Sequence, residues 1–280
     1  MGERDVSGVA HLWSVDEAAH SVDDLMTPDV LIQTERSTAT LIRSVARISE
    51  SGPQDASHLP GWSRLTIVCH LRYGAQALVW MTDDAIAGRP TSFYPRGRAE
   101  QRSATLRPEP GESPLDVVAS LKAASAALDE RWRRVTDWTV AVTEPSDNRS
   151  LGTVSLGHLA LLRLTEVEVH GTDLGVGLGP WSDVFVREAL PMRLAWLTTR
   201  RSNHRPVPDD LHRSWLLTAT DGGPTTLLAV DGALVTSTPA SPEDRADVVV
   251  RATSRELLAL LLGRSDLAVA SEFNTAFPGP

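Results

Sequence analysis

The sequence predicts a mixed α and α/β multidomain fold, in which a four-helix bundle is followed by a small α+β domain. Four long segments before residue 172 carry apolar residues at helical spacing. Beyond Pro208 the segments are short, rich in Val, Leu and Thr, and separated by Asp-Gly turns. The chain has 280 residues, of which 41% are hydrophobic, enough for one large domain or two ordinary ones. We therefore expect an N-terminal extension at residues 1–28, a helical bundle at 29–204 and an α+β domain at 205–280.

The first two helices of the bundle have clear boundaries. The extension before them is polar and acidic, with one short helix predicted at residues 14–26. An approximately helical apolar pattern begins at Asp29 and runs to Gly52-Pro53, which ends the first long helix. Ser63 is a suitable N-cap for the second helix, which carries a histidine in its first half.

The third and fourth helices are preceded by a connection rich in proline, glycine and arginine. This connection, residues 88–112, is predicted to be a long loop or a partly helical segment. Ser113, followed by proline at the first helical position, starts the third helix, which runs to about Thr136. The fourth helix is predicted at residues 156–171, with Ser155 as its cap and the glycine at the end of that range as its stop.

The last third of the chain changes from helical to mixed patterns. A fifth helix is predicted at residues 183–201. Short runs typical of strands follow at residues 215–220, 225–230 and 246–252, with Asp-Gly turns after the first two. A helix at residues 254–262 completes the predicted α+β domain.

Composition excludes several classes of function. The formal net charge is −9 and the pI about 5.4, so we expect no nucleic-acid partner. No apolar run is long enough to span a bilayer, and the first residues lack the apolar core of a signal peptide, so we expect a cytoplasmic protein without a membrane partner. The single cysteine, Cys69, permits neither an internal disulfide nor a cysteine-rich metal site, and is predicted to be buried and inert.

The fourth helix carries a pair of residues suited to metal binding. Glu166 and His170 are four residues apart, which is about 40° of rotation on a helix, so both side chains point the same way. Glu168 is about 200° from Glu166 and should face elsewhere. On spacing alone, an ordinary hydrogen-bonded pair is the commoner explanation. His70 is by itself most simply a core histidine, but in a bundle it could supply a third ligand.

Four short motifs occur in order along the chain. They are Leu59-Pro60-Gly61-Trp62, His70-Leu71, Tyr94-Pro95, and Glu166-Val167-Glu168-Val169-His170 with Asp173-Leu174. With these motifs the chain resembles the mycothiol-dependent maleylpyruvate isomerase family, part of the wider DinB-like group of metal-dependent bundles. The likeness spans roughly residues 30–200, and the C-terminal domain also looks like the one appended in that family.

The resemblance implies a DinB-like four-helix bundle and a set of ligands. His70, Glu166 and His170 would bind a divalent metal ion, usually zinc, and mycothiol, a thiol of actinobacteria, would be the cosubstrate. Three N/O ligands leave a coordination position open, as a catalytic zinc site requires. A thiol bound there would be deprotonated at neutral pH, so no serine or cysteine of the protein is needed as nucleophile.

Two departures from the isomerase pattern lead us to predict an S-transferase or thiol-exchange enzyme of secondary metabolism, acting on a small electrophile. The N-terminal extension is longer than the family core needs, and no C-terminal arginine can be matched to the one that binds substrate in an isomerase. The candidates are Arg213, Arg245, Arg251 and Arg264. The alternatives are a mycothiol-dependent maleylpyruvate cis–trans isomerase, a metal-dependent hydrolase, and a non-catalytic protein that binds a small ligand.

Further residues are candidates for the surroundings of the metal ion. Asp173 could orient the imidazole of a ligand or cap the end of the helix. The basic loop around Tyr94, Arg96 and Arg98, together with Arg102, could bind carboxylates of substrate or thiol, although a solvated surface is its simpler explanation. Four tryptophans could line the cavity, but we expect them in the core: Trp62, Trp80, Trp132 and Trp138.

Overall fold

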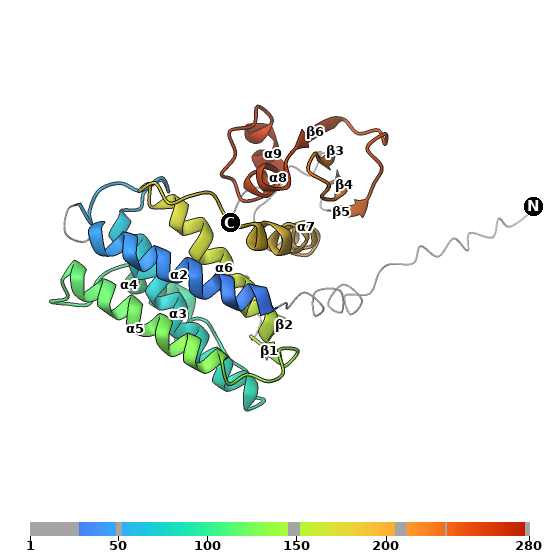
Figure 1. The fold of residues 1–280 in the computed structure, drawn as a ribbon. Coiled ribbons are helices and arrows are strands. Elements are labelled where there is room, and N and C mark those ends of the chain that lie inside the picture. The colour runs from blue at the N-terminus through green and yellow to red at the C-terminus, as the bar shows by residue number, and fades with distance from the viewer. Residues whose placement is uncertain (1–27, 49–51, 145–151, 205–211, 233, 278–280) are drawn as a thin grey trace, which may run out of the picture.

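Four long helices form a bundle in the computed structural model, which describes residues 28–48, 52–144, 152–204, 212–232 and 234–277. The bundle helices are α2 (Pro28–Ile48), α3 (Arg64–Ile86), α5 (Pro114–Trp132) and α6 (Leu156–Asp173). They run side by side in Figure 1, with the C-terminal strands and helices to one side of them. The predicted fold class is confirmed. The short helix predicted at residues 14–26 lies outside the described residues.

Three serines begin three of these helices, as predicted. The hydroxyl of Ser63 accepts a hydrogen bond from the amide of Thr66 at 3.1 Å, and Ser155 caps α6 in the same way. Ser113 and Asp116 form a reciprocal capping box at the start of α5. The prediction placed the end of α5 a few residues too late, because beyond Trp132 the backbone bonds shift from helical spacing to tighter turns.

The prediction for the end of α6 was wrong, and the difference matters for the site. Gly171 lies inside the helix, where an added Cβ atom would be in ordinary van der Waals contact with Leu178 at 3.5 Å. Gly175, just past the helix, has the positive φ of 67° that a helix stop requires. As a result Asp173 is still helical and lies on the same turn as His170.

The connections between the bundle helices contain three short elements. Residues 88–112 are partly helical, with α4 at Arg98–Thr105. Strands β1 (Ala141–Thr143) and β2 (Thr153–Ser155) form an antiparallel pair that we did not predict, because three residues are too few for a periodic pattern.

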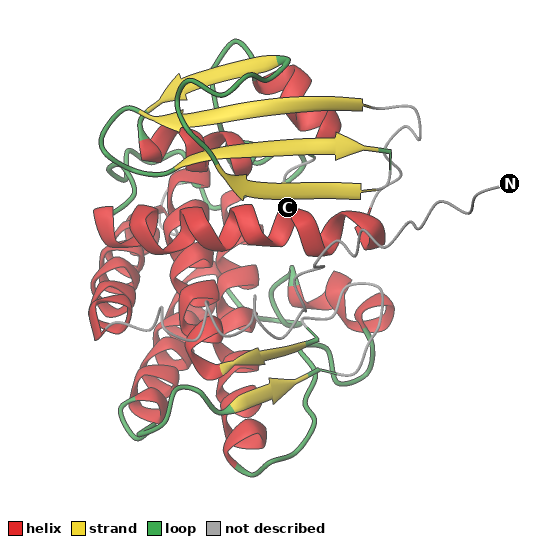
Figure 2. Cartoon of the chain, turned by 90° about the vertical axis from the view of Figure 1, so that its right-hand side faces the viewer, coloured by secondary structure: helices red, strands yellow, loops and turns green. Residues whose placement is uncertain are grey.

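The C-terminal part builds a four-stranded sheet next to a long helix. Its elements are α7 (Asp183–His204), β3 (His212–Ala219), β4 (Thr225–Asp231), β5 (Leu234–Pro239), β6 (Val248–Ala252), α8 (Ser254–Leu261) and α9 (Ala270–Ala276). The strand order is β5-β4-β3-β6, and only the pair β3–β6 is parallel. Figure 2 shows α7 lying crosswise between this sheet and the bundle. We missed β5, an exposed edge strand whose only buried residue is Val235, and the short helix α9.

The core consists of two clusters, and the smaller one supports the site. The larger cluster runs from the bundle through α7 to the sheet and the last two helices. The smaller one joins α2, the first turns of α3, α5 and the end of α6 through residues such as Leu41, Ile67, Leu121 and Val167. It fixes the first half of α3 against the last half of α6. Within the described residues, no helix is long and apolar enough to cross a bilayer.

Candidate metal centre

His70 on α3 and the Glu166/His170 pair on α6 come together in the structure. Their ligand-type atoms all lie within 4.8 Å of one another. The Oε2 atom of Glu166 is 2.7 Å from Nε2 of His70 and 3.4 Å from Nε2 of His170. One carboxylate oxygen therefore lies between two imidazole nitrogens that come from different helices. The two chain segments are 96 residues apart for the first of these contacts.

Asp173 orients one of these imidazoles. Its Oδ2 atom is 2.9 Å from Nδ1 of His170, and its side chain is only 4% exposed. Because a carboxylate accepts hydrogen bonds, Nδ1 of His170 donates to Asp173, and Nε2 is the ring nitrogen directed toward the cluster. Of the two roles predicted for Asp173, this contact corresponds to the orienting one.

Arg264 extends this chain of contacts to the C-terminal part. Its Nη2 is 3.0 Å from Oδ2 of Asp173, and its Nε is 3.3 Å from Oδ1, so the guanidinium binds both carboxylate oxygens. Of the four C-terminal arginines considered from the sequence, Arg264 is the one that the described contacts bring to the site. Arg213, by comparison, pairs with Glu272.

A cavity of about 660 Å³ lies beside the Asp173–Arg264 ion pair. It is lined by the His58–Pro60 loop, the end of α6, and residues of α8 and the loop after it, including Arg255. Arg255 is the second arginine of this cavity, but its partner is Asp183 at 2.6 Å rather than Asp173. Of the two arginines that line this cavity, Arg264 is therefore the one that contacts the residue orienting His170.

The electrostatics of the cluster suit a cation. Burial lowers the pKa of His70 and outweighs the opposing effect of Glu166, so this imidazole is neutral at pH 7. Burial also disfavours ionisation of Glu166, but the two histidines hold its pKa well below the usual range. For His170, burial alone would lower the pKa. The hydrogen bonds with Asp173 and Glu166 outweigh burial and raise the pKa to about 9.

Trp62 forms a wall of the cluster and also packs against the smaller core cluster, so both roles considered for it from the sequence apply. Its ring stacks on His170 at a centroid distance of 6.1 Å and meets His70 edge-on at 5.4 Å. The α2–α3 loop holds it there, because Ser57 donates a hydrogen bond to the carbonyl of Trp62. The other three tryptophans pack in or against the larger core cluster, as predicted: Trp80, Trp132 and Trp138.

The basic connection contributes to this region only in part. Tyr94 is 7% exposed, and the guanidinium of Arg98 lies 5.3 Å from the centre of its ring. Arg96 has a 70% exposed side chain and pairs with Glu100, and no described contact brings it to the cluster. Arg102, one turn after Arg98 on α4, lies over Trp62 instead. Arg102 had been included with Arg96 and Arg98 among the residues predicted to bind carboxylates.

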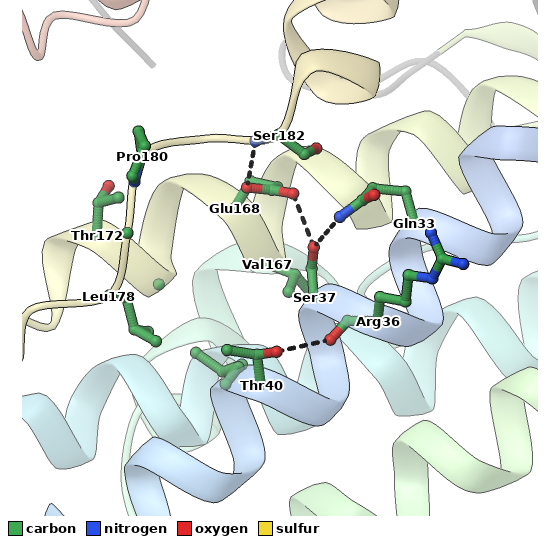
Figure 3. A pocket seen from close by; sticks show the side chains of 13 residues that line it. Gln33, Arg36, Ser37, Thr40, Val167, Glu168, Thr172, Leu178, Pro180 and Ser182 are labelled. Carbon is green, nitrogen blue, oxygen red and sulfur yellow. Dashed lines mark hydrogen bonds between the residues drawn. The ribbon is translucent and has the colours of Figure 1, made fainter.

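Two other predictions concern residues near the cluster. Cys69 is fully buried, as predicted, and burial raises the pKa of its thiol to about 11; that the thiol is inert stays a prediction. Glu168 faces away from Glu166, also as predicted. Its carboxylate accepts hydrogen bonds from the hydroxyl of Ser37 at 2.7 Å and the amide of Ser182 at 3.2 Å. Glu168 lines a second cavity, of about 260 Å³ (Figure 3). Through its two hydrogen bonds Glu168 connects α6 with α2 and with the start of α7.

The three side chains have the chemistry of a site for a divalent ion. Two imidazoles and one carboxylate are donors that zinc and related metals accept, and three protein ligands leave a further position for a water molecule or a substrate. The hydrogen bond from His170 to Asp173 is the supporting contact that metal-bound histidines generally have. The residues present therefore fit a catalytic metal centre.

The fold and the site together define a class of protein: a helical bundle with a candidate His-Glu-His metal centre, followed by a C-terminal sheet. Residues 34–175 match the family model described as the mycothiol maleylpyruvate isomerase N-terminal domain. Since the match covers just over half of the chain, the protein belongs to this family. The resemblance found in the sequence motifs is confirmed.

Two solved structures share the fold. The crystal structure of the mycothiol-dependent maleylpyruvate isomerase is 22% identical, with a TM-score of 0.65 and coverage of 87% of this chain and 92% of that chain. A histidine-to-alanine mutant of that isomerase gives 21% identity, a TM-score of 0.64 and the same coverage. At these identities the likeness concerns the fold, and it extends beyond the matched N-terminal domain. The comparison with curated proteins gave no significant match.

Proposed function

We propose that the protein is a mycothiol-dependent metalloenzyme that isomerises a cis double bond in a small unsaturated acid, with maleylpyruvate as the first candidate substrate. The observation that carries this proposal is the convergence of His70, Glu166 and His170 in a chain of this family. Family membership favours the isomerase over the S-transferase that we had predicted from the sequence. A cytoplasmic location and the absence of a nucleic-acid partner remain predictions.

The three ligand side chains would hold the ion. His70 and His170 would each use Nε2, the nitrogen nearest to Glu166, and Glu166 would use a carboxylate oxygen. Zinc is the first candidate, because it accepts this donor set in catalytic sites. A divalent ion supplies a Lewis acid that lowers the pKa of a bound thiol, so that a thiolate is present at neutral pH.

The residues around the ligands keep them in place. Asp173 accepts a hydrogen bond from Nδ1–H of His170 and fixes the orientation of the ring, and Arg264 holds Asp173 in its ionised form from the opposite side. The pKa of Asp173 is lowered, because these hydrogen bonds outweigh burial. Trp62 covers one side of both imidazoles. Since Cys69 is fully buried, we assign the attacking sulfur to an external thiol.

Isomerisation and transfer differ in the fate of this sulfur. In isomerisation a carbon–sulfur bond forms at the double bond, the electron pair moves onto the conjugated carbonyl group, and rotation occurs about the resulting single bond. The same carbon–sulfur bond then breaks, so the thiol is recovered and nothing is consumed. In S-transfer the sulfur stays in the product. The amount of thiol consumed per product therefore separates the two reactions.

The test uses the purified protein with zinc, mycothiol and maleylpyruvate. Isomer formation at constant thiol concentration supports the proposal, and the Glu166→Gln variant should lose most of this activity. If thiol disappears in proportion to product, the protein is an S-transferase. Cleavage of the substrate by water without thiol would instead indicate a hydrolase. Thiol binding without turnover of any candidate electrophile would favour the non-catalytic ligand-binding alternative.

A further inference from the structure

Arg102 is an arginine without an acidic partner next to the candidate metal centre. Its guanidinium carbon lies 5.8 Å from the centre of the Trp62 ring. Its one side-chain hydrogen bond among the described residues is a long one, 3.4 Å from Nη1 to the hydroxyl of Tyr94. No carboxylate in the described part of the chain pairs with Arg102. By contrast, Arg72 binds both oxygens of Glu112, and Arg96 pairs with Glu100.

The position of Arg102 links it to the cluster through Trp62. The same indole ring that lies under Arg102 contacts the imidazoles of His70 and His170. The guanidinium, the indole ring and the two imidazoles therefore form one continuous series of contacts that reaches the candidate metal ligands.

The contacts of Arg102 orient its guanidinium group but leave most of its N–H donors without a hydrogen-bond acceptor in the described part of the chain. A guanidinium has five N–H donors, and Tyr94 uses one of them. Stacking on Trp62 fixes the plane of the group, and Tyr94 is itself fixed by its stacked contact with Tyr73. The side chain of Arg102 is half-buried, so part of its hydration is lost. A half-buried, oriented guanidinium with free donors is suited to a carboxylate, which it can bind through two parallel hydrogen bonds.

We propose that Arg102, held over Trp62 by Tyr94, forms a carboxylate-binding subsite that anchors the acidic substrate beside the metal ligands. The assignment to the substrate rather than to the thiol rests on the proposed function, in which an unsaturated acid is isomerised. Anchoring one carboxylate leaves the other end of the molecule free to rotate about the reacting bond. The expected ligands are small dicarboxylates and keto acids.

The subsite can be tested by binding, without turnover. Succinate has two carboxylates but no double bond, and succinamide is its uncharged counterpart. Titration calorimetry of both compounds is carried out on zinc-loaded and on metal-stripped protein, without thiol. We expect succinate to bind in both samples and succinamide in neither, because the subsite recognises charge. Binding of succinate only in the zinc-loaded sample, with equal affinity in the Arg102→Gln variant, would assign the carboxylate to the metal ion and overturn the proposal.

Three variants give the result its specificity. Arg102→Gln should weaken succinate binding about tenfold or more, the usual effect of losing hydrogen bonds to a charged group. Arg102→Lys should lie between this variant and the parent, because lysine keeps the charge but loses the bidentate geometry. Arg96→Gln is the matched control on the same connection and should bind like the parent. Unchanged zinc content and melting temperature in Arg102→Gln would show that the fold is retained.

Kinetics separate the subsite from the proposed function. If both are correct, Arg102→Gln should raise the KM for maleylpyruvate about tenfold with a smaller change in kcat. Arg102-dependent succinate binding in a parent that does not turn over maleylpyruvate would retain the subsite and refute the isomerase. Turnover that Arg102→Gln leaves unchanged would retain the isomerase and overturn the subsite. Failure of the parent to bind succinate in either sample would also overturn the subsite.

Discussion

Replacing Asp173 by asparagine should weaken metal binding without unfolding the protein. Asp173 is 4% exposed, accepts a hydrogen bond from Nδ1 of His170 at 2.9 Å and binds Arg264 at 3.0 and 3.3 Å. Hydrogen bonds to a charged group contribute about 1.5–3 kcal/mol, which corresponds to about 10–100-fold in affinity. Asparagine keeps the shape and one acceptor oxygen but loses the charge. We therefore expect the zinc affinity of Asp173→Asn to fall by about tenfold, the lower end of this range.

The assay is a competition for zinc between the protein and a chromophoric chelator at fixed pH and salt. Asp183→Asn is the control, because Asp183 also pairs with an arginine but is 96% exposed and far from the cluster in its contacts. We expect the control to bind zinc like the parent. Equal zinc affinity in Asp173→Asn and the parent would refute the reasoning that Asp173 positions His170 as a ligand.

Three further predictions concern Arg264, His170 and Cys69. Arg264→Ala should lower zinc affinity about tenfold in the same competition assay, whereas Arg255→Ala, in the same cavity, should leave it unchanged. In metal-stripped protein the His170 pKa of about 9 means that zinc must displace a proton at pH 7, so the apparent affinity should rise about tenfold per pH unit up to about pH 9. A profile that is flat from pH 7 to 9 would contradict this. Because the buried Cys69 thiol has a pKa of about 11, native protein should resist a thiol reagent at pH 8, and Cys69→Ala should keep its turnover and zinc content.

Local rules explain what could be predicted from the sequence. Ser63, Ser113 and Ser155 are caps whose hydrogen bonds involve residues only three positions away, so they mark helix starts without any tertiary information. The pairing of Glu166 with His170 is also local, since the helix period alone places them on one face. Family motifs then added His70, which the local rules could not connect to the pair.

Long-range packing explains what could not be predicted. Arg264 lies 91 residues beyond Asp173 in a loop after α8, and no periodic pattern relates the two. Trp62 has the large apolar side chain that is typical of a core residue, and its contact with the imidazoles depends on the path of the α2–α3 loop. The end of α6 was misplaced because both Gly171 and Gly175 can stop a helix, and the sequence alone does not show that Gly175 is the one with a positive φ.

The preference for a transferase shows how weak an argument from departures can be. An N-terminal extension carries no information about the reaction, and it lies outside the described residues. The second departure was the lack of a C-terminal arginine that could be matched to the site. The structure places Arg264 against Asp173, so a C-terminal arginine does reach the site. Neither departure now favours transfer over isomerisation.

The central claim, that the three side chains form a metal centre, is tested most directly by elemental analysis of the purified protein after mild dialysis. The parent and two variants of the same helix are compared, Glu166→Ala and Glu168→Gln. Glu168 is the matched control, because it lies two residues from Glu166 but faces Ser37 and Ser182. We predict about one divalent ion per chain in the parent and in Glu168→Gln, and little in Glu166→Ala. Absence of metal from all three proteins, not restored by added zinc, would contradict the account and make the cluster a structural hydrogen-bonded one.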